Sequence, residues 1–462
     1  MINEEELAQL SYPEAPVIKT AIPGPEGAKY LEDSIAYESM ARGGGRFPLV
    51  FAEGKGSTVK DPDGNVYIDI TAGVAVNSVG RCHPRVIDAM MNQANILMHG
   101  SDISNTKRTE LAKKISGLAP PGLRDNCITY FTQSGSAAID TAIKFVRKIT
   151  GRTQVVAFHG AYHGIWMGGN SLTTGDQYRK DYGPFIPGVI HLPYPYCYRC
   201  PFGMEHPGCD LQCAKYVDYV LNTPYTAADD VGAVFIEAQQ GESGYVPAPP
   251  GYLEAVKKAC EKHGALYISD EVQSGAGRTG KLWCIEHSAV EPDMITFGKG
   301  VGGDVPVAGL VMRKDLAAKI VDHSQPNTWA ANAMLCSAAL TNLEILTEND
   351  RAVIKRCAEL GGELSQRLRD ASKEIEIIGD VRGKGLMIGI EMVEDKTSRK
   401  PLAGEKIGTI VMEMLGRGVV MVPCGRFGNV FRFMPPLVIT REHAMKATEI
   451  FLEVAKKVAS GK

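Results

Sequence analysis

The chain has 462 residues, and its 50 lysines and arginines against 53 aspartates and glutamates give a net charge of −3. This near-neutral balance argues against a dedicated nucleic-acid binder, because phosphate binding relies on concentrated positive charge. Hydrophobic residues make up 44% of the chain, which excludes wholesale disorder. Glycine is the one outlier, with 50 residues, and an excess of glycine indicates tight turns or backbone that comes close to a ligand.

The N-terminal residues are acidic and lack the basic start and the apolar stretch of a signal peptide. No window of the sequence approaches the roughly 18 uninterrupted apolar residues that span a bilayer. We therefore expect a cytoplasmic protein without membrane contact. The 11 cysteines are an odd number, and most lie in apolar runs, as is typical of reduced, buried thiols in an intracellular enzyme.

Short apolar runs alternate with amphipathic helices along the chain. Residues 57–76 carry an Asp-Pro-Asp-Gly turn between two strand-like runs, which predicts a hairpin. Residues 251–264 have apolar side chains at helical spacing and end at Gly264, a residue suited to a helix C-terminus. This helix lies between two apolar runs, so the order predicts a βαβ unit in a mostly parallel sheet. The predicted central strands are residues 127–131, 154–158, 233–238, 266–272 and 294–298.

The C-terminal part has a different pattern, in which long helices alternate with a strand pair over residues 377–393. We therefore predict an α/β protein with three parts. A large, mostly parallel-sheet domain spans residues 76–334, and a smaller α+β domain spans residues 335–462. Residues 1–75 form an N-terminal segment that packs with the small domain.

Ligands of parallel sheets bind at the C-terminal ends of strands, and four groups of residues fall there. Residues 133–137 open a helix with serine and glycine, whose free N–H groups suit a phosphate, although a simple serine N-cap explains the same residues. Asp270, followed by Glu271, ends a buried strand. Such a carboxylate holds either a protonated heterocycle or a metal, or it forms an internal salt bridge or a helix cap.

Lys299 ends the next predicted strand between two glycines. A desolvated lysine there has a lowered pKa and is a competent amine nucleophile, whereas a surface lysine on a turn is the alternative. Residues 158–164 contain aromatic side chains that either stack on a planar cofactor ring or pack in the core.

Residues 275–280, Gly-Ala-Gly-Arg-Thr-Gly, match the GxGxxG dinucleotide fingerprint. The context does not fit, because residues 281–293 contain no clear amphipathic helix and no acidic residue ends a further strand about 20 residues on. A nicotinamide-dependent oxidoreductase therefore has little support.

Four cysteines lie in one loop rich in proline and glycine, one pair at CxxC spacing and one at CxxxC spacing. They could hold a structural zinc ion, but the spacer of eight residues between the pairs is shorter than in the usual fingers. We expect reduced or locally bonded thiols and no metal. The four are Cys197, Cys200, Cys209 and Cys213.

The phosphate-type cup, the aromatic residue, Asp270 and Lys299 together meet the needs of pyridoxal phosphate (PLP). From roughly Pro48 to its C-terminus the sequence resembles the class III (ornithine/4-aminobutyrate-type) aminotransferases of fold type I. The most specific stretches are residues 267–280 and 296–300. The family carries Gly-Arg-Thr-Gly in the first stretch without binding a dinucleotide.

This resemblance implies a role for each matching residue. Lys299 matches the Schiff-base lysine that also moves the proton, Asp270 the partner of the pyridine nitrogen, and Arg432 the clamp on a substrate carboxylate. The other matches are Gly135 and Ser136 in the phosphate cup, Tyr162 stacked on the ring, Gln273 near the 3′-oxygen, Glu237 and Glu242 as an acidic pair, Thr328 as a phosphate ligand from the neighbouring subunit, and Val74 and Ile165 beside the substrate.

The resemblance also implies partners: a small-molecule amino donor, a 2-oxo acid acceptor, and a second copy of the chain. The shared phosphate ligand implies a homodimer with shared active sites, or a tetramer built from it.

Two departures concern the substrate. Enzymes that prefer 4-aminobutyrate carry an arginine where this chain has Ile165, so the far end of the substrate is uncharged or is held elsewhere.

The second departure concerns Glu242. In aminotransferases of this class the matching glutamate pairs with the arginine at position 432 and swings away for a dicarboxylate, whereas related racemases and epimerases carry an aspartate as a second base. We therefore predict a PLP-dependent aminotransferase that uses 2-oxoglutarate or pyruvate as acceptor. An amino-acid racemase or epimerase, with Lys299 and Glu242 on opposite faces of Cα, is the alternative.

Overall fold

The computed structural model describes residues 3–41 and 47–461. Its centre is a seven-stranded sheet in which only the second strand, β12, runs antiparallel to its neighbours. The mostly parallel sheet predicted for the central part of the chain is therefore confirmed. In spatial order the strands are β4 (Cys127–Thr132), β12 (Ala308–Arg313), β11 (Met294–Phe297), β10 (Leu266–Asp270), β7 (Val231–Ile236), β5 (Gln154–Phe158) and β6 (Val189–Leu192).

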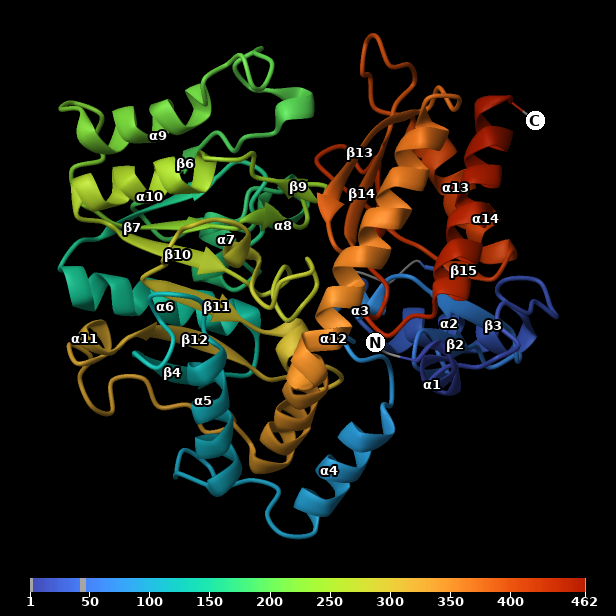
Figure 1. The fold of residues 1–462 in the computed structure, drawn as a ribbon, viewed down its shortest axis with the longest axis horizontal. Helices are drawn as coiled ribbons and strands as arrows, with labels where there is room; N and C mark the ends of the chain where they lie inside the picture. The colour runs from blue at the N-terminus through green and yellow to red at the C-terminus, as the bar shows by residue number, and fades with distance from the viewer. Residues whose placement is uncertain (1–2, 42–46, 462) are drawn as a thin grey trace.

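Helices cover both faces of this sheet (Figure 1). Alternate residues along β5 and β7 belong to two different buried clusters, because successive side chains of a strand point to opposite faces. The amphipathic helix α6 (Gly135–Thr150) packs on one face, and α5 (Thr106–Leu118), α9 (Gln212–Asn222) and α10 (Tyr252–His263) pack on the other. The predicted helix over residues 251–264 is confirmed, with Gly264 as its left-handed C-terminal residue.

Three strands end earlier than the sequence predicted: β11 ends one residue early, at Phe297, and at the other two a carboxylate at the site is the reason. Residues 233–238 were expected to be extended, but β7 ends at Ile236, and the Glu237 side chain accepts hydrogen bonds from two loop N–H groups. Residues 266–272 were expected to be extended, but β10 ends at Asp270, whose Oδ1 accepts the N–H of Val272. These local bonds turn the backbone away from the sheet ladder.

The C-terminal part contains a second sheet, which is antiparallel and is covered by helices. The expected strand pair over residues 377–393 is confirmed as β13 and β14. The long helix α12 (Ala333–Ser372) bends at residues 348–351 and leads from the large sheet into this part (Figure 1). The elements are β13 (Ile378–Lys384), β14 (Met387–Met392), β17 (Val430–Phe433) and β16 (Pro423–Cys424), with α13 (Gly404–Gly416) and α14 (Arg441–Ala459).

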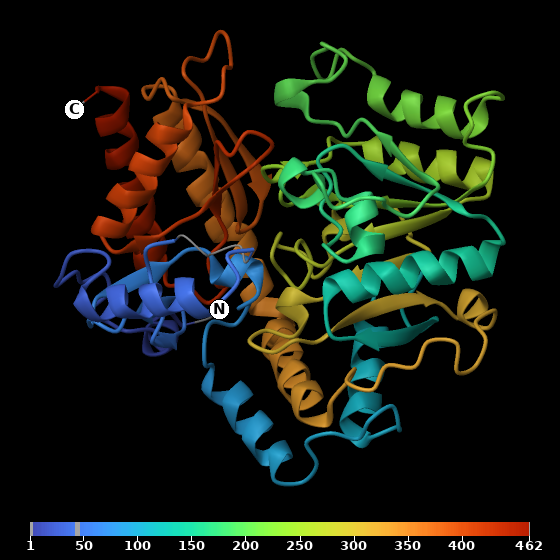
Figure 2. The ribbon, with the colours of Figure 1, turned by 180° about the vertical axis from the view of Figure 1, so that it is seen from behind.

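The N-terminal residues lie against the C-terminal part, as the view from behind shows (Figure 2). The predicted hairpin is formed by β2 (Thr58–Lys60) and β3 (Val66–Asp69), and β15 (Val419–Val420) pairs with β3 in parallel. The division of the chain at residues 75 and 334 stays a prediction. The remaining elements include α1 (Glu4–Gln9), α2 (Pro25–Tyr37), β1 (Glu53–Lys55), α3 (Ala72–Ala75), α4 (Pro84–Ala94), α7 (Met167–Leu172), α8 (Asp176–Arg179), β8 (Gln239–Gln240), β9 (Val246–Pro247) and α11 (Lys314–Ala317).

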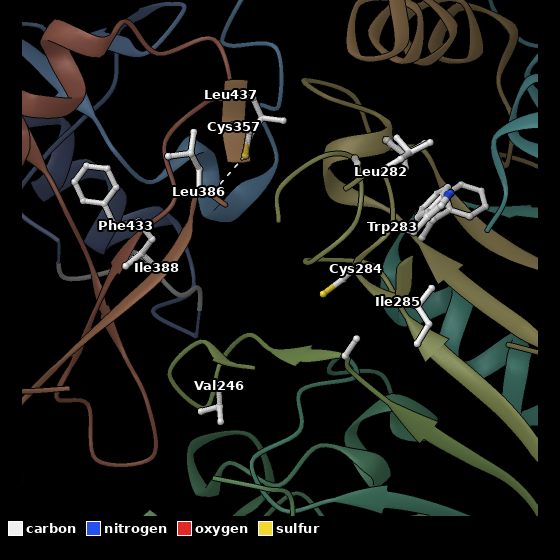
Figure 3. Close-up of a cluster of buried hydrophobic side chains, with 14 of the residues drawn as sticks. Val246, Leu282, Trp283, Cys284, Ile285, Cys357, Leu386, Ile388, Phe433 and Leu437 are labelled. Carbon is white, nitrogen blue, oxygen red and sulfur yellow. Dashed lines mark hydrogen bonds between the residues drawn. The ribbon is translucent and has the colours of Figure 1, made fainter. Parts of the chain in front are cut away.

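One buried cluster joins the large sheet to the C-terminal part (Figure 3). Leu282 to Ile285 come from the large-sheet side, and Cys357, Leu386, Ile388 and Phe433 come from the other side. The Leu386 N–H donates to the Cys357 sulfur at 3.3 Å. Because this apolar surface is shared, the two parts are held together beside the active-site loops. None of the described helices combines the length and the apolarity needed to cross a membrane.

Candidate active site

The predicted site residues gather at the C-terminal ends of the parallel strands. A cavity of about 160 Å³ lies there, between the first turn of α6 and the ends of β7, β10 and β11. Its lining includes most of the residues that the sequence singled out. These are Gly135, Ser136, Tyr162, Glu237, Glu242, Asp270, Gln273 and Lys299, together with Ser134, Ile139, His163, Gly164 and Val272.

Lys299 follows β11 directly and adopts a left-handed backbone conformation, with φ of 38°. This conformation is uncommon for a residue with a side chain and is found mostly where function requires it. Burial lowers the pKa of Lys299 from its ordinary 10.5 to about 8, although the carboxylates of Glu242, Asp270 and Glu237 oppose that effect. A substantial fraction of the amine is therefore neutral near pH 8, as a nucleophile or base must be.

Asp270 is buried and accepts three hydrogen bonds. His163 Nδ1 lies 2.7 Å from its Oδ2, while the Thr296 hydroxyl and the Val272 N–H donate to Oδ1, each at 3.0 Å. Burial alone would lower the pKa of His163, but the hydrogen bond to Asp270 and its charge raise that pKa above the ordinary value. The carboxylate is thereby fixed at the end of β10, facing the cavity.

The first turn of α6 serves both as a capped helix start and as a cup. Ser134 is the N-cap, and its side chain accepts the N–H of Ala137 at 3.2 Å, so the capping interpretation of that serine holds. Gly135 and Ser136 then line the cavity at the positive end of a 16-residue helix. A Cβ on Gly135 would come within 2.7 Å of Val272 Cγ1, so only glycine fits this place.

Glu237 closes the cavity on the side of β7. Its two carboxylate oxygens accept the N–H groups of Tyr162 at 3.0 Å and Gly241 at 2.8 Å. Burial raises the pKa of Glu237 to about 7, and the charge of His163 acts against this rise. The glutamate thus holds Tyr162, whose ring packs edge-on against Tyr178 with 5.1 Å between centroids. Gln273 presents a buried Oε1 that has no partner among the described residues.

Glu242 and Arg432 form an ion pair beside this cavity. Arg432 Nη1 donates to Glu242 Oε2 at 2.9 Å, and Arg432 comes from β17 of the C-terminal sheet. A second cavity of about 400 Å³ adjoins the first, since both are lined by Tyr162 and Glu242. Glu242 of this pair therefore lies where the two cavities meet.

Four predicted residues do not line either cavity, and one of them is Arg432, which reaches Glu242 from β17. Ile165 is 56% exposed, and its N–H donates to the Ser136 hydroxyl. Val74 lies in α3 and packs against the cluster that contains Tyr245 and Met434. Thr328 is exposed in the segment before α12, and its role in a neighbouring subunit stays a prediction.

The GxGxxG stretch and the four loop cysteines lie outside the two cavities. Arg278, in the Gly-Ala-Gly-Arg-Thr-Gly stretch, is buried and donates to the carbonyl oxygens of Leu386 and Pro435, and no amphipathic helix follows. The four loop cysteines are free thiols that line one small cavity. Over residues 3–41 and 47–461, no three His, Cys, Asp or Glu side chains converge as metal ligands.

Sequence reasoning did not identify His163 and Thr296 as partners of Asp270. Both lie in stretches that the sequence did single out, residues 158–164 and 296–300. Neighbouring parallel strands end at one edge of the sheet. Aligning β10 with β11 pairs Asp270 with Thr296, and this alignment was the signal that could have identified Thr296. The approach of His163 depends on the loop after β5 and has no such signal.

The described residues fit PLP. The cup at Gly135 is open because no side chain fills it, and the buried Gln273 Oε1 and His163 Nε2 lack partners among the described residues. A carboxylate, an aromatic ring and an amine of lowered pKa stand around the same cavity. These are the groups that a phosphorylated pyridine aldehyde requires.

Comparisons with known proteins agree with this site. The family described as aminotransferase class-III matches residues 39–455. An alanine/serine racemase of Pyrococcus horikoshii is 37% identical over 97% of this chain and 94% of its own length. A diaminobutyrate–2-oxoglutarate aminotransferase of Rhizobium meliloti is 36% identical over 90% of each chain. The structure of a taurine:2-oxoglutarate aminotransferase from Bifidobacterium kashiwanohense, in complex with PLP and glutamate, has a TM-score of 0.86 and 26% identity, covering 94% of this chain and 98% of that one.

Proposed function

The chain belongs to the class III aminotransferases, and from this premise we propose how its own residues divide the work. The enzyme depends on PLP and moves an amino group from an amino acid or ω-amino compound to a 2-oxo acid. Bound PLP supplies an aldehyde that links to amines and a pyridinium ring that withdraws electrons from the reacting carbon.

Lys299 Nζ would hold the cofactor and would move the proton during the reaction. As a free, neutral amine, Nζ would remove the proton from the reacting carbon of the donor and would later give a proton back. The lowered pKa of about 8 supports this role, because an amine at its ordinary value would stay protonated near neutral pH.

Asp270 would be the partner of the ring nitrogen of the cofactor. Three hydrogen-bond partners hold its carboxylate in place at the end of β10, and a carboxylate there would favour the charged, electron-withdrawing form of the ring. Gly135, Ser136 and the partner's copy of Thr328 bind the phosphate, Tyr162 stacks on the ring, and Gln273 binds the 3′-oxygen. Glu237 positions Tyr162 through the hydrogen bond to its N–H.

The ion pair between Glu242 and Arg432 is the observation that carries transamination. While Glu242 binds Arg432, the arginine is not available to a substrate, so the site accepts a donor whose end nearest Arg432 is uncharged. Arg432 becomes available when a dicarboxylate acceptor displaces Glu242. Such a switch suits an enzyme that must take two different substrates in turn at one site. A racemase binds one substrate and needs no switch.

Racemisation or epimerisation is the second candidate, and the similarity to the alanine/serine racemase favours it. The two activities separate when the holoenzyme is incubated with one L-amino acid and no oxo acid. An aminotransferase converts at most about one equivalent of donor per active site until an acceptor is added, whereas multiple-turnover formation of the D-isomer supports the racemase. The test is repeated with 2-oxoglutarate and with pyruvate.

We further propose a cytoplasmic homodimer with shared active sites. Exposed apolar side chains support the dimer, since Ile96 is 79% exposed and Ile103 is 75% exposed. They lie near the segment that carries Thr328, because His99 stacks on Trp329 with 4.5 Å between ring centroids. Sedimentation of the holoenzyme tests the assembly, and Thr328→Ala tests the shared site through PLP affinity.

A further inference from the structure

The larger cavity beside the cofactor pocket has a cation in its lining. About 400 Å³ is enough for the far part of a small substrate. Arg426, which follows β16, lines this cavity together with His159, Tyr178 and Glu242. Since Tyr162 and Glu242 belong to both cavities, a substrate that reaches Lys299 extends past them toward Arg426.

Contacts on two sides hold Arg426. Its Nη2 donates to the carbonyl oxygen of His159 at 3.0 Å, and its guanidinium carbon lies 5.1 Å from the centre of the Tyr196 ring. Gly160 leaves room for this arrangement, because a Cβ there would come within 3.0 Å of Nη2. Arg426 is exposed to solvent, but these contacts restrict its side chain, so less conformational entropy is lost when it binds a ligand.

Arg426 has no carboxylate within ion-pair distance among residues 3–41 and 47–461. The neighbouring acids are engaged elsewhere, Glu242 by Arg432 and Glu391 by Arg199 and Arg382. Asp176 also lines the cavity and, like Arg426, is exposed to solvent, but it forms no ion pair with Arg426. The guanidinium therefore offers its charge and its remaining N–H groups to a ligand.

We propose that Arg426 is the specificity-determining residue that binds the distal carboxylate of the amino donor, so that the enzyme prefers donors whose reacting amino group lies at the other end of the molecule. This proposal rests on the proposed aminotransferase function. A guanidinium binds a carboxylate through two parallel hydrogen bonds, which fixes the direction of the ligand. It also accounts for Ile165, because a carboxylate held by Arg426 needs no arginine at that position.

The test compares donors that differ only in the carboxylate. We would follow the donor half of the reaction on the holoenzyme without acceptor, by cofactor absorbance in rapid mixing. The ω-amino acids are 4-aminobutyrate, 5-aminopentanoate and 6-aminohexanoate, and the n-alkylamines of the same carbon number are their matched partners. The variants are Arg426→Gln and Arg426→Lys, with Arg367→Gln as the control for loss of an exposed positive charge on α12.

We expect Arg426→Gln to lower the ratio of rate constants for acid over amine by roughly 10- to 100-fold, with Arg426→Lys in between and Arg367→Gln like the parent. Equal losses for both donor types, or an unchanged ratio, overturn the proposal. A parent enzyme that converts α-amino acids but none of the three ω-amino acids also overturns it. If the parent enzyme transfers no amino group from any donor to any 2-oxo acid, the proposed function itself fails.

Discussion

His163 Nδ1 lies 2.7 Å from Asp270 Oδ2, and both side chains are buried at the end of the central sheet. The histidine comes from the loop after β5 and the aspartate from the end of β10. This pair holds the carboxylate that faces the ring nitrogen in the proposed mechanism. Burying a carboxylate is costly unless hydrogen-bond donors surround it, and Asp270 has three such partners.

Asp270→Asn is expected to lower the rate of amino transfer on the order of 100- to 1,000-fold, because the ring nitrogen loses its anionic partner. Saturating PLP should still bind, since the phosphate cup is intact. His163→Gln is expected to cost less, because Val272 and Thr296 still hold the carboxylate. Single-turnover rates and PLP titration measure both effects. A larger loss for His163→Gln than for Asp270→Asn would contradict the assignment.

The lowered pKa of Lys299 predicts how the apoenzyme takes up PLP. Only the neutral amine attacks the aldehyde, so the attachment rate should rise as pH increases through about 8 and then level off. A lysine of ordinary pKa would give a rate that still climbs at about pH 10. Growth of the visible absorbance after mixing, followed from about pH 6.5 to 9.5, measures the profile. Lys299→Ala should show no such absorbance that borohydride removes.

Glu242→Ala is expected to leave Arg432 permanently available. A dicarboxylate then binds without displacing the glutamate, so KM for 2-oxoglutarate should fall by roughly 2- to 10-fold. Glu242→Asp is the matched control, because it keeps the charge but shortens the reach toward Arg432. Steady-state transamination with 2-oxoglutarate and with pyruvate measures the effect. If KM falls equally for pyruvate, the ion pair does not act as the switch between substrates.

Gly135→Ala is expected to weaken PLP binding, because the added methyl group meets Val272 at 2.7 Å and pushes the first turn of α6. We expect a loss of affinity on the order of 10-fold or more. Equilibrium dialysis or absorbance titration of the apoenzyme measures it. Gly362→Ala is the matched control, since a Cβ there meets nothing within 4 Å on α12. Equal PLP affinity in the two variants would contradict the cup assignment.

Substitution of Glu391 is expected to lower the free energy of unfolding strongly. It is fully buried and accepts hydrogen bonds from Tyr196, Arg199 and Arg382, which join the loop before α9 to the C-terminal sheet. Glu391→Gln should lower the free energy of unfolding by about 3 to 5 kcal/mol, because Arg382 loses its buried partner. Urea unfolding of the holoenzyme measures it, and the exposed Glu449→Gln, expected to cost at most about 1 kcal/mol, is the control.

The same carboxylate predicts the acid limit of stability. Burial acts to raise the pKa of Glu391, but the charge of Arg382 holds that pKa below its ordinary 4.5. A group with a lowered pKa in the folded state stabilises the protein above its unfolded pKa, and this contribution is lost as pH falls through the folded pKa. The difference in unfolding free energy between the parent and Glu391→Gln should therefore shrink as the medium becomes more acidic than about pH 4.5. A difference that grows toward acid pH would contradict the ion-pair origin.

Much of the fold follows from local patterns in the sequence. Residues 154–158 and 294–297 are strands because short, β-prone apolar runs can be buried on both faces of a parallel sheet, and Gly264 ends a helix because it tolerates a left-handed backbone. Strand ends were less certain. At Asp270 the side chain accepts the N–H of Val272, two residues on, whereas at Glu237 it accepts the N–H of Tyr162, which lies far along the chain.

The sequence by itself placed Lys299, Asp270 and the glycine-serine turn at one edge of the sheet, because each follows a strand and parallel strands end at one edge. Their roles follow from the resemblance to the family and stay a prediction. The high glycine content is explained in part by positions such as Gly135, where the structure leaves no room for a side chain. Only the tertiary structure decided which residues stand opposite one another. The contact of His163 with Asp270, the pair of Glu242 with Arg432, and the place of Arg426 join segments over 100 residues apart. The first contact depends on the path of the loop after β5 and the other two on how the large-sheet part and the C-terminal part pack, and a local pattern carries no record of either.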